Sequence, residues 1–433
     1  MAGSRHQTFS APGFRDGVNN VFREDSVPAN QLRHAVNVDL LPDGKIRRRS
    51  GYTRRLSLPA CRSAASHLGR IYMASEGKLV QVDPRTYDHT EVANVDAFSY
   101  LSFESLNEKL YFTDGVSTFL SVLPSGDAVS VAPENPSRQP DVSTVAMGSL
   151  PAGRYQVAIT FVRAGGEESG TGRAALASLT QEGSIQLQNI PVPAQADIQS
   201  VNVYCSHASG EILYRVATLS AGTTSFTVST VPNGKALETQ FLQPLPVGSI
   251  VRSHNARLYV ARRRELYFSE AFRFGQHNPW KNYVSFDSDI TMIRPVESGM
   301  YVSTEHSTYF LRGQDPLAND FAMTQVHEYG AVRGTDTLVR AGMFSFENLS
   351  TGHVAVWWST NGTMIVGLPN GQVQPLREGE LSLPEFERGS VSVREYNGVQ
   401  QLVSTLKNPK TPSSALAATD EFTVTVHRNG IEV

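Results

Sequence analysis

A short hairpin pattern recurs along this chain, and it constrains the fold more than any other feature. In residues 255–286, two short apolar strands, RLYVA and ELYFS, flank a basic turn and precede a long loop. Related segments begin at Gly69 (GRIYMASEGKLVQVD), Asn107 (NEKLYFTDGVSTFLSVL) and Glu297 (ESGMYVSTEHSTYFLRG). Repeated hairpins of this size are typical of β-propellers, in which each blade is a small antiparallel sheet.

The composition also favours an all-β chain. The 433 residues include 34 Gly and 23 Pro, which interrupt the sequence at intervals that suit short strands and not long helices. This length exceeds what a single core accommodates, so two or three domains are expected. No apolar run reaches 18 residues, and we therefore predict no membrane span.

We expect three parts along the chain. Residues 1–136 would hold an N-terminal segment and the first two blades, residues 137–245 an inserted β-sandwich, and residues 246–433 the remaining blades, about six in all. A Pro-rich polar linker at residues 133–143 precedes the sandwich. The apolar strand at residues 421–433 is expected to pair with an N-terminal strand and close the ring.

Alternation of apolar and polar residues predicts which side chains point inward. In the first blades we expect Ile71, Met73, Leu110 and Phe112 in the core. The strand spacing of the inserted part resembles that of an immunoglobulin-like, fibronectin type III-like module. Its predicted inward face consists of Tyr155, Val157, Ile159, Phe161, Val201, Val203 and Cys205.

Motifs for catalysis are scarce. The sequence holds no GxSxG, HExxH or GxxxxGK[ST] segment, and its histidines do not fall at metal-ligand spacing beside Cys or carboxylates. We therefore predict no enzyme and no cofactor. Several acids near predicted strand ends could still form the carboxylate pair of a glycosidase, although exposed acids are normal at such places. These candidates are Asp114, Glu270, Asp287, Asp289 and Glu305.

Positive charge is concentrated near the N-terminus, although the formal net charge is −3. Residues 1–62 carry 11 Lys and Arg against 5 Asp and Glu, and no acid occurs from Gly44 to Ser75. Guanidinium groups bind phosphate or carboxylate through forked hydrogen bonds, so this run suits DNA, an acidic partner protein or a solvated edge strand. In that run, the residues that would face a partner or DNA are Lys45, Arg47, Arg48, Arg49, Arg54 and Arg55.

A second basic cluster, Arg262, Arg263 and Arg264, occupies the turn between RLYVA and ELYFS. Two-residue hairpin turns prefer Gly, Asn or Asp, because these residues tolerate a positive φ. Three arginines here therefore suggest a wider turn. Their positive charge either contacts a partner or is merely tolerated at the surface. The same choice of partners applies as for the first cluster, and no nucleic-acid-binding signature accompanies either one.

Two segments carry a resemblance to a known family. The first signature follows the pattern "aNQ…a.NvdL…G.lrrRpGy" and the second the pattern "rlYvA…lYfSe…P..W..NY..F". Together they resemble the tail nozzle protein (also called tail tube or tail hub protein) of short-tailed bacteriophages. The first signature is carried by Asn30, Gln31, Ala35, Asn37, Val38, Asp39, Gly44, Arg48, Arg49, Gly51 and Tyr52. The second is carried by Leu258, Tyr259, Val260, Ala261, Tyr267, Phe268, Ser269, Glu270, Pro279, Trp280, Asn282, Tyr283 and Phe286.

The resemblance implies a non-enzymatic protein of the virion tail, made in the cytoplasm of the bacterial host. Six copies would form a ring below the portal and its adaptor (the head-to-tail connector), and DNA would pass through its centre during ejection. The sandwich would face outward or toward tail fibre, spike or needle proteins. Because phosphate contacts would accumulate in six copies, we favour a protein interface over a DNA-gripping role for the arginines of residues 47–55.

The alternative is a carbohydrate-binding or glycoside-cleaving propeller that acts on a host surface polysaccharide. It would need exposed aromatic side chains together with a carboxylate pair on one face. Of the three tryptophans, Trp357 and Trp358 lie within a predicted strand, where core packing is expected.

Overall fold

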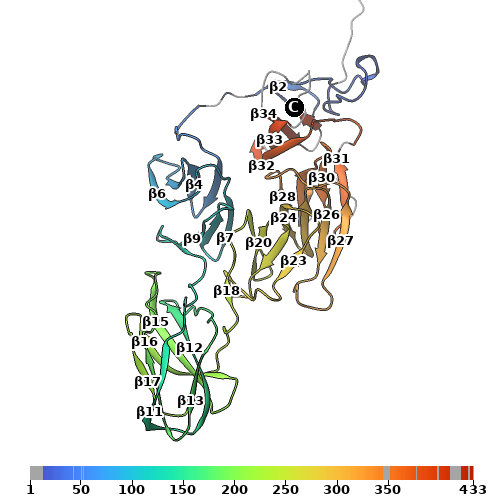
Figure 1. Ribbon diagram of the computed structural model, residues 1–433. Helices are drawn as coiled ribbons and strands as arrows, with labels where there is room; N and C mark the ends of the chain where they lie inside the picture. The colour runs from blue at the N-terminus through green and yellow to red at the C-terminus, as the bar shows by residue number, and fades with distance from the viewer. Residues whose placement is uncertain are drawn as a thin grey trace, which may run out of the picture. The chain divides into compact units, whose positions relative to one another are not determined.

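The computed structural model describes residues 13–41, 43–49, 51, 53–344, 352–376, 378–396, 399–409, 421–427 and 430–432 (Figure 1). Within these residues the helical segments are two single 3-10 turns, η1 (Glu24–Ser26) and η2 (Ala341–Met343). None of the described helices is long and apolar enough to cross a membrane. The prediction of an all-β chain is therefore confirmed.

The chain divides into two compact units, which we describe separately. The central unit comprises Leu58–Arg262 and Leu266–Val284, and the terminal unit comprises Met1–Ser57, Arg263–Glu265 and Ser285–Val433. Both consist mainly of four-stranded antiparallel sheets in which consecutive strands are neighbours. This meander order is the blade pattern of a β-propeller.

The first two sheets of the central unit occupy the stretch where the sequence predicts two blades. Their strands are three to six residues long, and short connections, several of which contain Gly or Asn, join each strand to the next. The first sheet contains β3 (Ser63–His67), β4 (Arg70–Ser75), β5 (Lys78–Val82) and β6 (His89–Asn94). The second contains β7 (Ser102–Leu106), β8 (Lys109–Thr113), β9 (Phe119–Val122) and β10 (Ala128–Ser130).

A third meander follows the inserted sandwich. It contains β19 (Ile250–His254), β20 (Arg257–Arg262), β21 (Glu265–Phe268) and β23 (Tyr283–Ser285). A separate short pair, β18 (Gln243–Pro244) with β22 (Gln276–His277), lies between the sandwich and this sheet in the chain.

The terminal unit contains three further meanders and an N-terminal hairpin. The first contains β24 (Ile290–Val296), β25 (Gly299–Thr304), β26 (Thr308–Arg312) and β27 (Ala322–His327). The second contains β28 (Thr337–Arg340), β29 (His353–Trp358), β30 (Met364–Gly367) and β31 (Val373–Leu376). The third contains β32 (Phe386–Tyr396), β33 (Val399–Pro409), β34 (Glu421–His427) and β35 (Gly430–Glu432). The hairpin pairs β1 (Val38–Leu40) with β2 (Ile46–Arg48). The described residues thus hold six meander sheets, and their closure into one ring stays a prediction.

A buried tyrosine marks the same register position in four of the sheets. Tyr72, Tyr111, Tyr259 and Tyr301 lie on the second strand of their sheets, each opposite the equivalent residue of the first strand (Ala65, Glu104, Arg252 and Arg294). Each is at most 4% exposed. Tyr72 packs with Leu110 of the next sheet, and Tyr301 lies 5.3 Å from Trp357 of the next sheet. This repeat is what stacked propeller blades require, because each blade buries its face against the following one.

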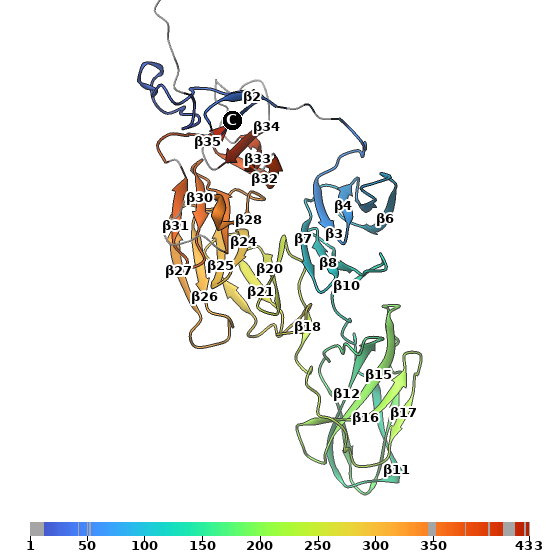
Figure 2. The same cartoon turned by 180° about the vertical axis from the view of Figure 1, so that it is seen from behind.

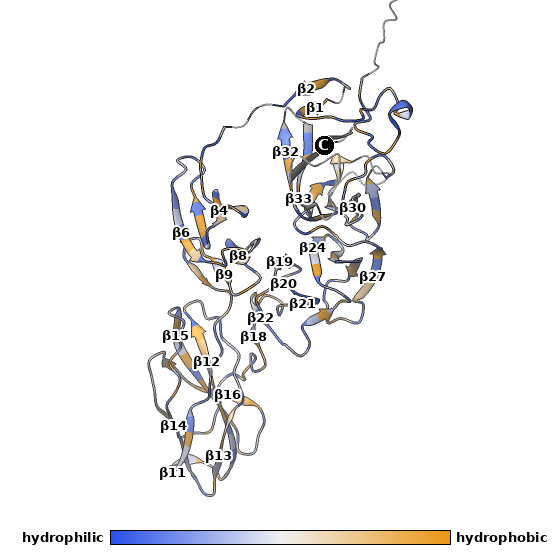
Figure 3. Ribbon diagram, turned by 45° about the horizontal axis from the view of Figure 1, so that its top comes forward, coloured by the Kyte–Doolittle hydropathy of each residue, from blue (hydrophilic) through white to orange (hydrophobic). Residues whose placement is uncertain are grey.

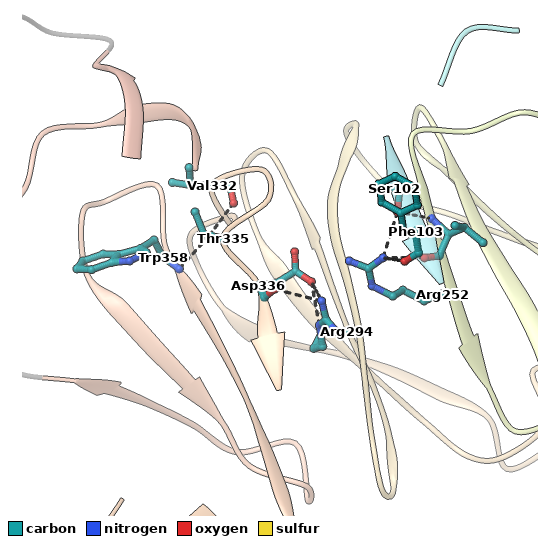
Figure 4. Close-up of polar contacts among 9 residues, drawn as sticks. Ser102, Phe103, Arg252, Arg294, Val332, Thr335, Asp336 and Trp358 are labelled. Carbon is teal, nitrogen blue, oxygen red and sulfur yellow. Dashed lines mark hydrogen bonds and ion pairs between the residues drawn. The ribbon is translucent and has the colours of Figure 1, made fainter. Parts of the chain in front are cut away.

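In two sheets, one in each unit, the residue opposite the tyrosine is an arginine that contacts a neighbouring sheet (Figure 4). In the central unit, Arg252 donates hydrogen bonds to Ser102 Oγ (3.1 Å) and to the carbonyl of Phe103 (3.3 Å). In the terminal unit, Arg294 Nε donates to a carboxylate oxygen of Asp336 (2.8 Å), which is 7% exposed. Both contacts run from the first strand of one sheet to a neighbouring sheet, so they fix how adjacent blades meet.

The inserted part is a two-layered β-sandwich (Figure 2). One layer has the order β11 (Asp141–Leu150), β14 (Gly183–Gln188), β17 (Phe226–Val228), and the other β13 (Ala175–Leu179), β12 (Gly153–Arg163), β15 (Ile198–Ser206), β16 (Leu213–Ser220). The predicted inward face is confirmed: its seven members are at most 2% exposed and share one core cluster. Apolar residues dominate β12 accordingly (Figure 3). The fibronectin type III-like subtype stays a prediction.

Two expectations about the blades are wrong. In β4 the buried side chains are Tyr72 and Ala74, whereas Ile71 and Met73 are only half-buried. Blade strands have neighbours on both faces, so apolar alternation does not tell which face is the deeper one. The final strands also pair differently: β34 pairs with β33 and β35, and the described part of this sheet contains no N-terminal strand.

Candidate functional site

Two of the predicted surface arginines hold the N-terminal hairpin together. Asp39 lies in β1 and is 1% exposed. It accepts a hydrogen bond from Arg49 Nε at 3.0 Å and lies 3.6 Å from the guanidinium of Arg47, its register partner in β2. A buried carboxylate requires such partners, because an unpaired charge in this position would be strongly destabilising. Arg47 and Arg49 therefore have a structural role, and whether they also face a partner stays a prediction; the Arg47 side chain is 36% exposed and that of Arg49 14%.

The remaining arginines of the basic run are exposed. Arg48 alternates with Arg47 along β2 and points away from Asp39, and Arg54 and Arg55 lie in an irregular segment. These three side chains form no ion pair with any described residue, and we call them the free arginine set. Lys45 instead pairs with Asp43 at 2.7 Å; the hydrogen bond between them raises the pKa of Lys45 and lowers the pKa of Asp43.

The second basic cluster forms a tight turn. Only Arg263 and Arg264 separate β20 from β21, so the expected wider turn is wrong. Arg263 adopts φ +53°, and its carbonyl accepts a hydrogen bond from the Ile290 amide (2.9 Å), while the carbonyl of Arg264 accepts one from Phe286 (2.9 Å). These bonds compensate for the left-handed backbone that such a turn requires. Arg262, Arg263 and Arg264 are all exposed, and Arg264 lies 3.3 Å from Glu265.

The first signature builds the attachment of the N-terminal segment. Gln31 accepts a hydrogen bond from buried Asn19 (3.0 Å), and Asn30 donates to Asp16. Asn20 exchanges two hydrogen bonds with the backbone of Ser382, at 2.8 and 2.7 Å. Contacts between positions 362 residues apart tie the start of the chain to the connection between β31 and β32.

Gly44 shows why the signature needs a glycine at this position. Its φ is +84°, and a Cβ atom there would lie 3.1 Å from the Cα of Gly13. The Gly44 carbonyl accepts the amide of Phe14 at 2.8 Å. The two glycines let the N-terminal segment approach the hairpin turn closely.

The second signature holds the long loop after β21. Asn282 is fully buried and donates to Glu270 Oε1 (3.1 Å), and its carbonyl accepts the amide of Phe268 (3.1 Å). Arg257, 5% exposed, donates to the carbonyl of Ser269 at 2.7 Å. These contacts brace the loop from within. Trp280 is different, because 82% of its surface is exposed.

The loop also forms one wall of a groove that sequence reasoning missed. The groove has a volume of about 420 Å³ and is lined by Glu238, Phe241, Glu270, Arg273, Asn278 and Lys281, among others. Phe272, between the lining residues Ala271 and Arg273 in the sequence, is 80% exposed. The sequence signal was the segment EAFRFGQHNPW, in which exposed aromatic residues alternate with charged and amide residues.

The five candidate carboxylates do not share one environment, and Asp287 and Asp289 are exposed. Asp114 is 3% exposed; burial would raise its pKa, but hydrogen bonds from the amides of Thr118, Val116 and other residues outweigh burial and lower it. Glu305 lies 3.7 Å from Arg333, and Glu270 lies 3.3 Å from Lys281. The described residues contain no group of three or more side chains that could hold a metal ion.

Buried histidines should make the central unit sensitive to acid. Burial lowers the pKa values of His254 and His277, so the folded unit binds fewer protons than the unfolded chain below the ordinary pKa of about 6.5. The free energy of unfolding should therefore fall as pH drops below that value, by about 1 kcal/mol per unit of pKa difference. We expect the melting temperature of His277→Gln to change less between pH 7 and pH 5 than that of the parent chain. The variant His89→Gln, at an exposed position, should show the same pH dependence as the parent. Equal pH dependence of the melting temperature in the two variants would contradict this expectation.

No family model and no curated protein matches the chain. Among solved structures, BBS1N in complex with ARL6DN is 11% identical, with 81% of this chain and 90% of that chain covered and a TM-score of 0.32. U3-55K is 10% identical, with 87% of this chain and 97% of that chain covered and a TM-score of 0.33. The N-terminal domain of Nup159 is 11% identical, with 86% of this chain and 75% of that chain covered and a TM-score of 0.28. At these TM-scores the likenesses carry no argument about activity or partners.

Proposed function

We propose that this chain is a structural protein of a short-tailed phage tail. Six copies would form a nozzle ring below the portal and its adaptor, through which DNA is ejected. The observation that carries the proposal is the N-terminal signature: its residues build a hairpin braced by Asp39, on which Arg48 is exposed. Arg54 and Arg55 follow it in the chain and are exposed as well. Blade sheets joined by Arg252 and Arg294 would supply a rigid body for such a ring.

The free arginine set would meet an acidic surface of the adaptor. Three exposed arginines per copy would amount to many phosphate contacts in a ring of six, and DNA affinity rises steeply with the number of such contacts. A channel that passes DNA quickly should not hold it tightly. A protein interface therefore suits these side chains better than a DNA-gripping role, while DNA passes the ring transiently.

The test is whether the purified protein joins a portal–adaptor complex. We expect co-sedimentation in a ratio of six copies of this chain to one portal ring, with tail fibre, spike or needle proteins binding afterwards. A chain that stays free of the complex at physiological salt would contradict the proposal.

The alternative is a carbohydrate-binding or glycoside-cleaving propeller. For its cleaving form, a glycosidase needs a carboxyl group with a raised pKa as general acid; hydrogen bonds from backbone amides lower the pKa of Asp114, which therefore does not suit that role. Trp357 and Trp358 are at most 1% exposed and so are not available for a sugar. Incubation with host surface polysaccharide separates the two functions: release of reducing ends would favour cleavage over the nozzle.

A further inference from the structure

The groove between the end of the sandwich and the third sheet lies wholly within the central unit. Glu238 and Phe241 come from the connection between β17 and β18, and Glu270, Arg273, Asn278 and Lys281 come from the loop after β21. Both walls are fixed near the groove, since Leu245 donates its amide to the carbonyl of Gly275 at 2.6 Å. The groove is thus a built feature of two segments about thirty residues apart in sequence.

The two segments that form the groove carry three exposed aromatic residues. Phe241 lines the groove, whereas Phe272 and Trp280 are sequence neighbours of the lining residues Arg273 and Lys281. Phe241, Phe272 and Trp280 are 62%, 80% and 82% exposed. Exposed aromatic residues beside a groove are candidates for contact with a ligand.

The backbone holds these aromatic residues in place at an energetic cost. Phe272 adopts φ +59°, which is unfavourable for a bulky residue, and its amide donates to the carbonyl of Ala256 at 2.8 Å. Strain of this kind concentrates at functional sites, where the surrounding structure maintains it.

Trp280 stands on a similarly braced turn. The Asn278 side chain accepts the Trp280 amide at 3.0 Å, and the Asn278 carbonyl accepts the amides of Lys281 (3.2 Å) and Asn282 (2.9 Å). Asn282 is in turn anchored by Glu270. The backbone that carries the exposed indole is therefore ordered before any ligand binds, so less conformational entropy is lost on binding.

The charged residues that line the groove are two acids and two bases. Arg273 lies 3.1 Å from Glu238, and Lys281 lies 3.3 Å from Glu270. Outside the lining, Lys235 also lies 2.8 Å from Glu238, and Arg257 lies 3.8 Å from Glu270. The lining therefore offers many hydrogen-bond donors and acceptors and has a formal net charge of zero. It therefore does not suit a polyanion such as nucleic acid, which requires an excess of positive charge.

We propose that this groove binds a neutral oligosaccharide, with sugar rings stacked on Trp280 and Phe272 and hydroxyl groups bound by the Arg273–Glu238 and Lys281–Glu270 pairs. The negative face of an aromatic ring attracts the polarised C–H groups of a sugar ring, and ionised pairs form strong hydrogen bonds with hydroxyls. A protein partner fits less well, because charged Lys and Glu residues are depleted from the centres of protein interfaces. The binding does not depend on the nozzle function.

The groove would bind the sugar without cleaving it. Hydrogen bonding and the charge of Lys235 lower the pKa of Glu238, which is the opposite of what a general acid requires. Glu270 is held by Lys281 and Asn282. Neither carboxylate is prepared to protonate a leaving group.

The protein carries its own reporter for a test. Of the three tryptophans, Trp357 and Trp358 are buried in the terminal unit, so a ligand-induced change in tryptophan emission reports on Trp280. We would titrate the full chain with maltohexaose, cellohexaose, chitohexaose and mannohexaose, and with a heparin hexasaccharide as acidic comparison. At least one neutral hexasaccharide should change the emission saturably at millimolar concentration, and the heparin fragment should not.

Variants locate the binding. Phe272→Ala should weaken it about tenfold, and Trp280→Ala, followed by calorimetry, at least as much. Phe98→Ala removes an aromatic side chain that is 78% exposed away from the groove and should change nothing. Absence of binding by every neutral hexasaccharide would overturn the proposal, as would unchanged binding in Trp280→Ala. Loss of adaptor docking in Trp280→Ala without any saccharide binding would assign the groove to a protein instead.

Discussion

Replacing Arg48, Arg54 and Arg55 by glutamate is expected to abolish docking on the portal adaptor while leaving the fold intact. The three side chains are exposed and form no ion pair with described residues, so their reversal breaks no contact that we observe. Each copy would lose three positive and gain three negative charges, and like charges across an interface are strongly repulsive. Binding to the adaptor, measured by co-sedimentation, should fall on the order of a hundredfold or more.

Two further variants make this result specific. Arg49→Glu places a second acid beside buried Asp39 and should destabilise the hairpin by about 3–5 kcal/mol, so its loss of docking would reflect misfolding. Reversing Arg262 and Arg264 instead tests the second cluster without touching the first. If the triple variant folds, melts like the parent chain and still docks, the free arginine set is not the interface.

Replacing Trp358 by alanine is expected to destabilise the terminal unit by about 3–5 kcal/mol. Trp358 is 1% exposed within the cluster that joins β29 to Leu402 and Leu406 of the following sheet. Its Nε1–H donates to the Ser404 hydroxyl at 2.9 Å, so the substitution also leaves a buried hydroxyl without this partner. Urea unfolding followed by circular dichroism would show the lower midpoint.

Trp280→Ala is the matched control, since it removes the same side chain from an exposed position. It should change the free energy of unfolding by no more than about 0.5 kcal/mol. Ser404→Ala should cost about 1 kcal/mol, the net value of one hydrogen bond. Similar stability of the Trp358→Ala and Trp280→Ala variants would contradict the packing of these two sheets described here.

The repeated hairpins made the architecture predictable, because blade turns and strand lengths are local properties of the sequence. The sandwich core was equally accessible, since Tyr155, Val157 and Ile159 alternate with residues of the opposite face. The degree of burial within a blade could not be predicted from the sequence. Ile71 and Tyr72 are both largely apolar, and only packing against the next sheet makes Tyr72 the more buried of the two. Alternation identifies two faces without ranking them.

The candidate surfaces were predictable only in part. The composition located the basic run, but the register decides that Arg47 and Arg49 pair with Asp39 while Arg48 points away from it. The groove was missed because its walls come from separate segments. Neither Phe241 nor Trp280 has a distinctive sequence neighbourhood that reveals the other.

The proposed ring is tested most directly by electron microscopy of the purified protein mixed with portal and adaptor. The account predicts particles with a six-fold ring of this chain attached to the adaptor, and loss of that ring in the Arg48→Glu, Arg54→Glu, Arg55→Glu variant. A parent chain that remains monomeric beside intact portal–adaptor particles would contradict it.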